Sequence, residues 1–120
     1  MKRVTGIGGI FFKSRDPKAL GEWYRRHLGL DVTEWGGAMF QPDDAPGYTL
    51  WSPFKHDTKY LEPSAREFML NFRVDDLDAL LPVLRAEGVH VLARREDGEF
   101  GTFGYCVDPE GTLIELWQPA

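Results

Sequence analysis

The chain has 120 residues, a net charge of −5 and an apolar content of 42%. This length suits a single domain with its own hydrophobic core. The acidic balance without a basic cluster argues against nucleic acid as a partner, and no stretch is apolar for long enough to span a membrane.

The cysteine content and the N-terminal residues predict a cytoplasmic protein. Cys106 is the only cysteine, so no internal disulfide is possible and a reducing compartment is favoured. It lies in an apolar segment and is expected to be buried and inert rather than nucleophilic. The apolar run from Ile7 to Phe12 is too short for a signal peptide and is not followed by a cleavage site.

In chain order, Val4–Lys13 predicts a strand, and a helix follows it. Asp16 is a suitable N-cap, Pro17 suits the first helical position, and Gly29 closes the helix. The apolar stripe between them has helical spacing and consists of Leu20, Trp23, Tyr24, His27 and Leu28. Because His27 lies on this stripe, we expect a core or edge histidine rather than a ligand.

Three short strands are expected next, and a polar connector then separates the two halves of the chain. Turns at Gly36-Gly37 and within residues 42–47 divide these strands, which span Leu30–Trp35, Ala38–Gln41 and Tyr48–Ser52. The connector, residues 54–65, is polar, contains His56 and shows no periodicity.

The second half repeats the same order of elements. A strand is expected over Arg66–Val74, and Asp75 and Asp76 open a helix that Gly88 ends. Pro82 lies inside that helix, where it removes a hydrogen bond and predicts a late helix start or a kink. The remaining elements are strands at Val89–Ala93 and Phe100–Val107, a charged turn at Arg94–Gly98, and a final strand around Glu115.

An offset of sixty residues aligns the two halves. The matched pairs include Phe12 with Phe72, Lys13 with Arg73, Asp16 with Asp76, and Leu20 with Leu80. Internal duplication determines the architecture. We therefore predict one α+β domain, residues 1–120, with two tandem βαβββ modules whose mixed sheets curl around a central cleft. The modules are residues 1–53 and 66–120, and the connector 54–65 joins them.

The closing strand brings a carboxylate into that cleft. Asp108-Pro109-Glu110-Gly111 forms a turn, and period-two alternation then puts Glu115 and Trp117 on one face and Leu116 on the other. A buried Glu is costly unless it is paired, protonated or bound, and an edge-strand Glu facing water is the alternative. The ligand-binding residues expected on the cleft are Phe11, Thr49, Trp51, Met69, Asn71, Arg73, Tyr105, Glu115 and Trp117. Lys13 and Arg73 are expected at its rim, unless they are solvated charges at the strand ends.

The chain resembles the glyoxalase / bleomycin-resistance / extradiol-dioxygenase superfamily, which has the vicinal oxygen chelate fold. The resemblance covers essentially the whole chain. It rests on the duplication and on three motifs: Trp-Tyr-x-x-x-Leu-Gly (23–29), Phe-Arg-Val-Asp-Asp-Leu-Asp-Ala-Leu (72–80) and Asp-Pro-Glu-Gly-x-x-Ile-Glu-Leu (108–116). Such a resemblance is specific for the fold and says little about the reaction.

Metal-dependent members of this superfamily typically take ligands from four strand positions, which the resemblance places at Gly9, Thr49, Met69 and Glu115. Only Glu115 suits a divalent ion, because glycine has no side chain, a thioether is soft and a neutral hydroxyl is a poor ligand. We expect no metal site, unless His56 folds back over the cleft. Without a metal to hold it, Glu115 is expected to add little to stability. Glu115→Gln should then weaken ligand binding and leave stability unchanged or raised.

Three functional hypotheses follow. The first is a metal-independent small-molecule binding protein without a cofactor, forming a homodimer as its relatives usually do. The second is an enzyme of the same superfamily, a lyase, isomerase or dioxygenase, with a relocated metal or with acid–base chemistry by Glu115. The third is an interaction module with a vestigial cleft.

Overall fold

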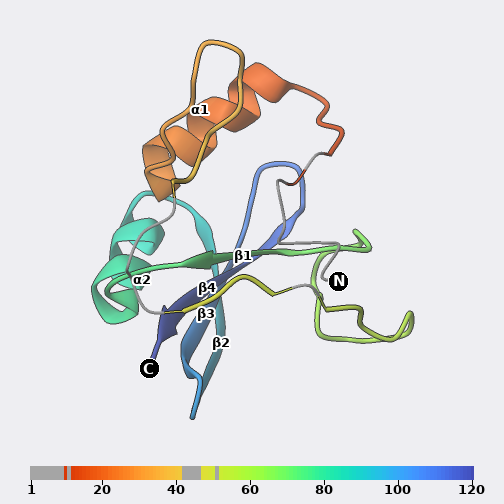
Figure 1. Ribbon diagram of the computed structural model, residues 1–120, viewed down its shortest axis with the longest axis vertical. Helices are drawn as coiled ribbons and strands as arrows, with labels where there is room; N and C mark the ends of the chain where they lie inside the picture. Colours follow the sequence, from red (N-terminus) through yellow and green to blue (C-terminus); the bar gives the residue numbers. More distant parts are fainter. Residues whose placement is uncertain (1–9, 11, 42–46, 51) are drawn as a thin grey trace, which may run out of the picture.

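The computed structural model describes residues 10, 12–41, 47–50 and 52–120. Its elements are α1 (Pro17–Leu28), β1 (Leu70–Arg73), α2 (Leu77–Ala86), β2 (His90–Gly98), β3 (Gly101–Val107) and β4 (Leu113–Pro119). The strands form one mixed sheet in the order β1-β4-β3-β2, in which β1 runs parallel to β4 and the other pairs are antiparallel (Figure 1). The predicted α+β class is confirmed. Neither described helix is long and apolar enough to cross a membrane.

The two helices are built alike, as the internal repeat predicts. Asp16 accepts a hydrogen bond from the Ala19 N–H at 3.1 Å, and Asp76 accepts the equivalent bond from Ala79 at 3.0 Å. Each helix is followed by a glycine in the left-handed region, where φ is +70° at Gly29 and +83° at Gly88. The sequence signals at the helix ends are therefore confirmed.

Both helices contribute to one core on one face of the sheet. The buried cluster joins helix residues to alternate residues of the strands: Leu20, Tyr24, Leu70, Leu77, Leu81, Leu84, Val89, Cys106, Ile114 and Leu116. Gly104 lets α2 approach closely, because a Cβ there would lie 3.0 Å from a methyl carbon of Leu81. The predicted position of Leu116 beneath the helices is confirmed.

His27 lies at the edge of this core. Its side chain is 11% exposed, packs 5.3 Å from the Trp23 ring, and contacts Glu87 of α2 at 3.0 Å through Nδ1. The expectation of a core or edge histidine is confirmed.

Pro82 does not delay the start of α2. The helix begins at Leu77 and contains Pro82 as its sixth residue, so the predicted late start is wrong. The cost of the missing hydrogen bond is opposed by the burial of Leu77, Leu81 and Leu84 on the core side of the helix. The alternative of a kink stays a prediction.

The three strands predicted between Leu30 and Ser52 are wrong over the described residues. The described residues of this region show one isolated bridge, between Val32 and Ala38, and residues 30–41 fold back along α1 (Figure 1). Its large apolar side chains, including Trp35 and Phe40, are exposed. A lone hairpin without a packed face is marginal, which explains why strand propensity does not produce strands here.

The first predicted strand, Val4–Lys13, lies mostly outside the described residues, and Phe12 and Lys13 are not in a strand. Among the residues that the structure describes, the first half therefore contributes α1 and one bridge. A second half-sheet, and with it the pair of sheets curled around a central cleft, is not seen in that part of the chain.

The charged turn predicted at Arg94–Gly98 is also wrong. These residues extend β2, and the turn to β3 consists of Glu99 and Phe100. Strand β2 lies at the edge of the sheet, where charged side chains remain solvated or paired. Arg95, for example, pairs with both Asp78 and Asp97.

Cys106 is fully buried, and burial raises the pKa of its thiol to about 12. Because the thiolate is the reactive species, we expect no labelling of the native protein by a disulfide reagent at about pH 8. Labelling should become stoichiometric in denaturant. Rapid labelling of the folded protein would contradict this expectation.

Candidate functional site

Glu115 lies in the middle of β4, between two strands that supply its neighbours. The register places Asn71 of β1 on one side of it and Tyr105 of β3 on the other. These residues alternate with the helix-facing Ile114 and Leu116, so they belong to the opposite face of the sheet. Glu115 is 5% exposed. The alternative of a strand carboxylate facing water is therefore wrong.

Three uncharged groups lie within hydrogen-bond distance of the Glu115 carboxylate, and the two tyrosine hydroxyls among them share their two protons between Glu115 and Glu96. Asn71 Nδ2 donates to Oε1 at 2.8 Å, whereas the Tyr60 and Tyr105 hydroxyls lie 2.5 Å and 2.9 Å from Oε2. Tyr60 comes from the connector and the other two donors come from the sheet. The buried charge is thus compensated by hydrogen bonds to neutral groups.

Glu96 of β2 joins the same tyrosines. Its Oε2 lies 3.0 Å from the Tyr60 hydroxyl and 2.6 Å from the Tyr105 hydroxyl, and the two hydroxyls are 2.7 Å apart. We call Tyr60, Glu96, Tyr105 and Glu115 the tyrosine–glutamate cluster. Burial raises the pKa of both tyrosines above the ordinary value, and their bonds to the carboxylates raise it further. Both hydroxyls therefore remain protonated donors at neutral pH.

Arg94 holds the connector against the cluster. Its guanidinium carbon lies 4.1 Å from the centre of the Tyr60 ring and 4.2 Å from that of the Tyr105 ring. It also donates to the Tyr60 carbonyl at 2.8 Å and lies 3.7 Å from Glu96. Phe54 packs edge-on against Tyr60, with 5.4 Å between the ring centres. The residues around Tyr60 thus cover this face of the sheet.

The bond from Tyr105 holds the pKa of the Glu96 carboxyl below its ordinary value, with smaller contributions from Tyr60 and Arg94. A lowered pKa in the folded state stabilises the protein above the unfolded-state pKa of about 4.3. That stability is lost as pH falls through the folded-state value. At pH 7, Glu96→Gln should lower the free energy of unfolding by at most about 1 kcal/mol, because Glu96 is half exposed and screened.

The difference between this variant and wild type should shrink as pH falls below about 4. Urea denaturation at both pH values measures it, and Glu99→Gln, in the exposed turn, is the matched control. A difference that grows on acidification would contradict the assignment.

Three of the residues predicted for the cleft, Asn71, Tyr105 and Glu115, come together as just described. Trp117 lies on the same face but is 4% exposed, because it stacks on Phe103 and donates to the Phe100 carbonyl at 2.8 Å. Trp117 is therefore a packed core residue and does not offer an exposed surface to a ligand.

Of the other predicted site residues that the structure describes, Thr49, Met69 and Arg73 form no hydrogen bond with the cluster. Thr49 and Arg73 are exposed and Met69 is half-buried. Phe11 and Trp51 lie outside the described residues. His56 is exposed and contacts Glu67 at 3.4 Å.

Sequence reasoning missed Tyr60, Arg94 and Glu96. Tyr60 meets Tyr105 across 45 residues from an aperiodic connector, so no local pattern indicates the contact. For Arg94 and Glu96 a signal exists, because Gly98 and Gly101 flank a two-residue loop typical of a hairpin. A hairpin predicted from these two glycines would place Arg94 and Glu96 on a strand beside Tyr105.

The Asp-Pro-Glu-Gly turn performs a separate task, which is to anchor α1 to the sheet. Asp108 is buried; its Oδ1 accepts the N–H groups of Glu110 and Thr112, and its Oδ2 accepts the Tyr24 hydroxyl at 2.8 Å. Glu110 accepts the Ser14 hydroxyl at 2.7 Å. Both carboxylates of the turn therefore connect to α1 or to the segment before it.

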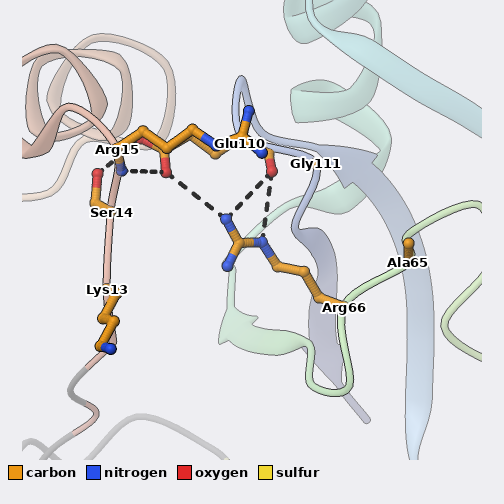
Figure 2. A pocket seen from close by; sticks show the side chains of 7 residues that line it. All are labelled: Lys13, Ser14, Arg15, Ala65, Arg66, Glu110 and Gly111. Atoms are coloured by element: carbon orange, nitrogen blue, oxygen red, sulfur yellow. Dashed lines mark hydrogen bonds and ion pairs between the residues drawn. The ribbon is translucent and has the colours of Figure 1, made fainter.

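A cavity of about 490 Å³ opens beside this anchor. Figure 2 shows its lining, with Arg66 reaching Glu110 from the segment before β1, and Ser14 and Arg15 contacting the same carboxylate from the segment before α1. Lys13 also lines this cavity, away from the position predicted for it at the rim of a Glu115 cleft. A second cavity, of about 610 Å³, lies between the C-terminal end of α1, β1 and α2.

The model of the glyoxalase-like domain family matches residues 9–117. The chain belongs to this family. No curated protein matches the chain. A similar solved structure is the NAD-dependent benzaldehyde dehydrogenase from Legionella pneumophila, with 16% sequence identity and a TM-score of 0.44. The alignment covers 89% of this chain and 94% of that one. At that level the similarity has no bearing on the function.

The metal that many glyoxalase-like proteins bind does not fit the residue types that this sequence has at the four corresponding positions. Of the four corresponding positions, Thr49 is exposed, Met69 offers a thioether and Gly9 has no side chain. Both oxygens of Glu115 already accept hydrogen bonds. Across residues 10, 12–41, 47–50 and 52–120, no three His, Cys, Asp or Glu side chains are grouped to hold a metal ion.

Proposed function

We propose that this glyoxalase-like domain binds a small organic molecule without a metal, on the sheet face that carries Glu115. The observation that supports this proposal is the set of donors on the Glu115 carboxylate. Asn71, Tyr60 and Tyr105 are neutral hydrogen-bond donors, and a carboxylate whose oxygens already have such partners suits an organic hydroxyl or amide N–H better than a metal ion.

We expect the ligand to bind where the Tyr60 hydroxyl contacts Glu115. Asn71 and Tyr105 are fixed by the strands β1 and β3, whereas Tyr60 belongs to the irregular segment between Ser52 and β1. A ligand hydroxyl or N–H could replace the Tyr60 hydroxyl on Glu115 when this segment moves. The Tyr105 ring and the Arg94 guanidinium would then offer flat surfaces for an aromatic or unsaturated ligand.

A thermal-shift screen of aromatic and hydroxylated metabolites, with protein treated with EDTA, tests this proposal. A hit should raise the melting temperature of the metal-free protein and lose affinity at least about tenfold in Glu115→Gln, roughly 1.4 kcal/mol. Tyr60→Phe removes the competing hydroxyl and should bind the hit more tightly. Glu99→Gln is the matched control. Binding that requires a restored divalent metal would refute the proposal.

We also propose that the protein is a homodimer. Trp35, Met39, Phe40 and Leu50 are large apolar side chains that are each at least 66% exposed, and exposed apolar surface can mark a protein–protein interface. Two-fold pairing is the commonest way to bury such a surface. Light scattering at micromolar concentration should give the dimer mass, and Phe40→Asp should shift it toward the monomer. A monomer mass for the wild type would contradict this prediction.

A further inference from the structure

We propose that the cavity beside the α1 anchor binds the anionic oxygen group, carboxylate or phosphate, of a small molecule. The cavity measures about 490 Å³ and is widely open to solvent. Its polar lining consists of Lys13, Ser14, Arg15, Arg66 and Glu110. None of these residues belongs to the tyrosine–glutamate cluster, so this site is independent of the function proposed above.

The charge of the lining favours an anion. Lys13, Arg15 and Arg66 bring three positive charges to a cavity that holds one carboxylate, that of Glu110, in a chain whose net charge is −5. Arg66 is the cation that pairs with Glu110, at 3.7 Å. Within the described part of the chain, Lys13 and Arg15 form no ion pair. Two cationic side chains therefore face the cavity without a carboxylate partner there.

The Glu110 carboxylate fills a group of donors beside the cavity, so an external anion would bind next to these donors and not on them. The Glu110 oxygens accept the Ser14 hydroxyl at 2.7 Å, the Arg15 N–H at 3.0 Å and the Asp16 N–H at 3.4 Å. The Ser14 bond is the main reason that the pKa of the Glu110 carboxyl lies below its ordinary value. A hydroxyl and two successive backbone N–H groups form the kind of concavity that holds anions.

Figure 2 shows Arg66 reaching toward Glu110 and the Lys13 side chain directed away from it, so we expect a second anionic group to lie between Lys13 and Arg66. Arginine and lysine are the residues that proteins use for carboxylate and phosphate groups. Glu110 and the external anion would carry like charge. The charge of Glu110 should therefore weaken anion binding. Removing this charge and removing the cations should have opposite effects on the affinity.

Titration of ¹⁵N-labelled protein with inorganic phosphate, and separately with acetate, at constant ionic strength provides the primary test. Amide shifts should concentrate at residues 13–16, 65–66 and 110–111 and saturate in the millimolar range. Saturation by phosphate alone would identify a phosphoryl group, and saturation by acetate alone would identify a carboxylate. Shifts that are absent or spread evenly over the surface would overturn the proposal.

Two variants with opposite expectations complete the test. The double variant Lys13→Ala/Arg15→Ala keeps the Arg15 N–H bond to Glu110 and should weaken binding at least about tenfold, the equivalent of roughly 1.4 kcal/mol. Glu110→Gln should tighten binding several-fold. Lys55→Ala/Arg85→Ala removes the same charge from exposed positions outside the cavity and should bind as wild type does. An equal loss in this control, or weaker binding in a folded Glu110→Gln protein, would refute the site.

Discussion

Replacing Asp108 by alanine is expected to lower the free energy of unfolding by about 4 kcal/mol. The Asp108 carboxylate is buried and accepts hydrogen bonds from the Glu110 N–H at 2.8 Å, the Thr112 N–H at 2.9 Å and the Tyr24 hydroxyl at 2.8 Å. Alanine would leave the buried Tyr24 hydroxyl and the Thr112 N–H without this acceptor. The change would therefore weaken both the turn before β4 and the attachment of α1.

Urea denaturation measures this loss, and two variants define its origin. Asp31→Ala removes a carboxylate from an exposed position and should change stability by less than about 0.5 kcal/mol. Tyr24→Phe removes only the connection to α1 and should cost about 1 to 2 kcal/mol. A loss for Asp108→Ala no larger than that of Asp31→Ala would mean that the turn does not anchor the helix.

Glu115→Gln is expected to lower the free energy of unfolding by about 2 kcal/mol, since hydrogen bonds to a charged acceptor contribute more than neutral ones. The carboxylate accepts from Asn71 and competes with Glu96 for the protons of the Tyr60 and Tyr105 hydroxyls. A glutamine amide offers one acceptor oxygen, and its NH2 group would meet either another donor or reoriented hydroxyls. The expectation from the sequence alone, unchanged or raised stability, assumed a carboxylate without partners. The three donors reverse the sign of that expectation.

Chemical denaturation of Glu115→Gln beside Glu99→Gln gives the measurement, and the ligand screen provides the second readout. Unchanged stability together with lost ligand binding would show that the tyrosine–glutamate cluster binds the ligand and contributes little to the stability of the fold. A loss in both would agree with the structure and the proposed function.

Both helices and the alternation of the last strand could be predicted, because their signals are local. Asp16, Pro17 and Gly29 delimit α1, and Asp76 and Gly88 delimit α2, because capping depends on residues within one turn of the helix end. The alternation along β4 is also a local signal. It correctly assigned Glu115 and Leu116 to opposite faces of the sheet, since successive side chains of a strand point to opposite faces.

Part of the candidate site followed from those local signals. Asn71 and Tyr105 were predicted on the face of Glu115, and strand register brings all three together. Arg94 and Glu96 were assigned to a turn, although the loop between Gly98 and Gly101 makes them part of β2. Their position beside Tyr105 required the correct length of that strand.

The tertiary structure alone decided what covers the sheet. Tyr60 reaches Glu115 across 55 residues, and the energy that holds it there comes from long-range contacts with Arg94 and Tyr105. Strand formation between Leu30 and Leu50 was decided in the same way. The described residues of this range have the apolar and aromatic content of strands, but a strand is stable only with a neighbour to pair with and a face to bury, and their large apolar side chains are exposed.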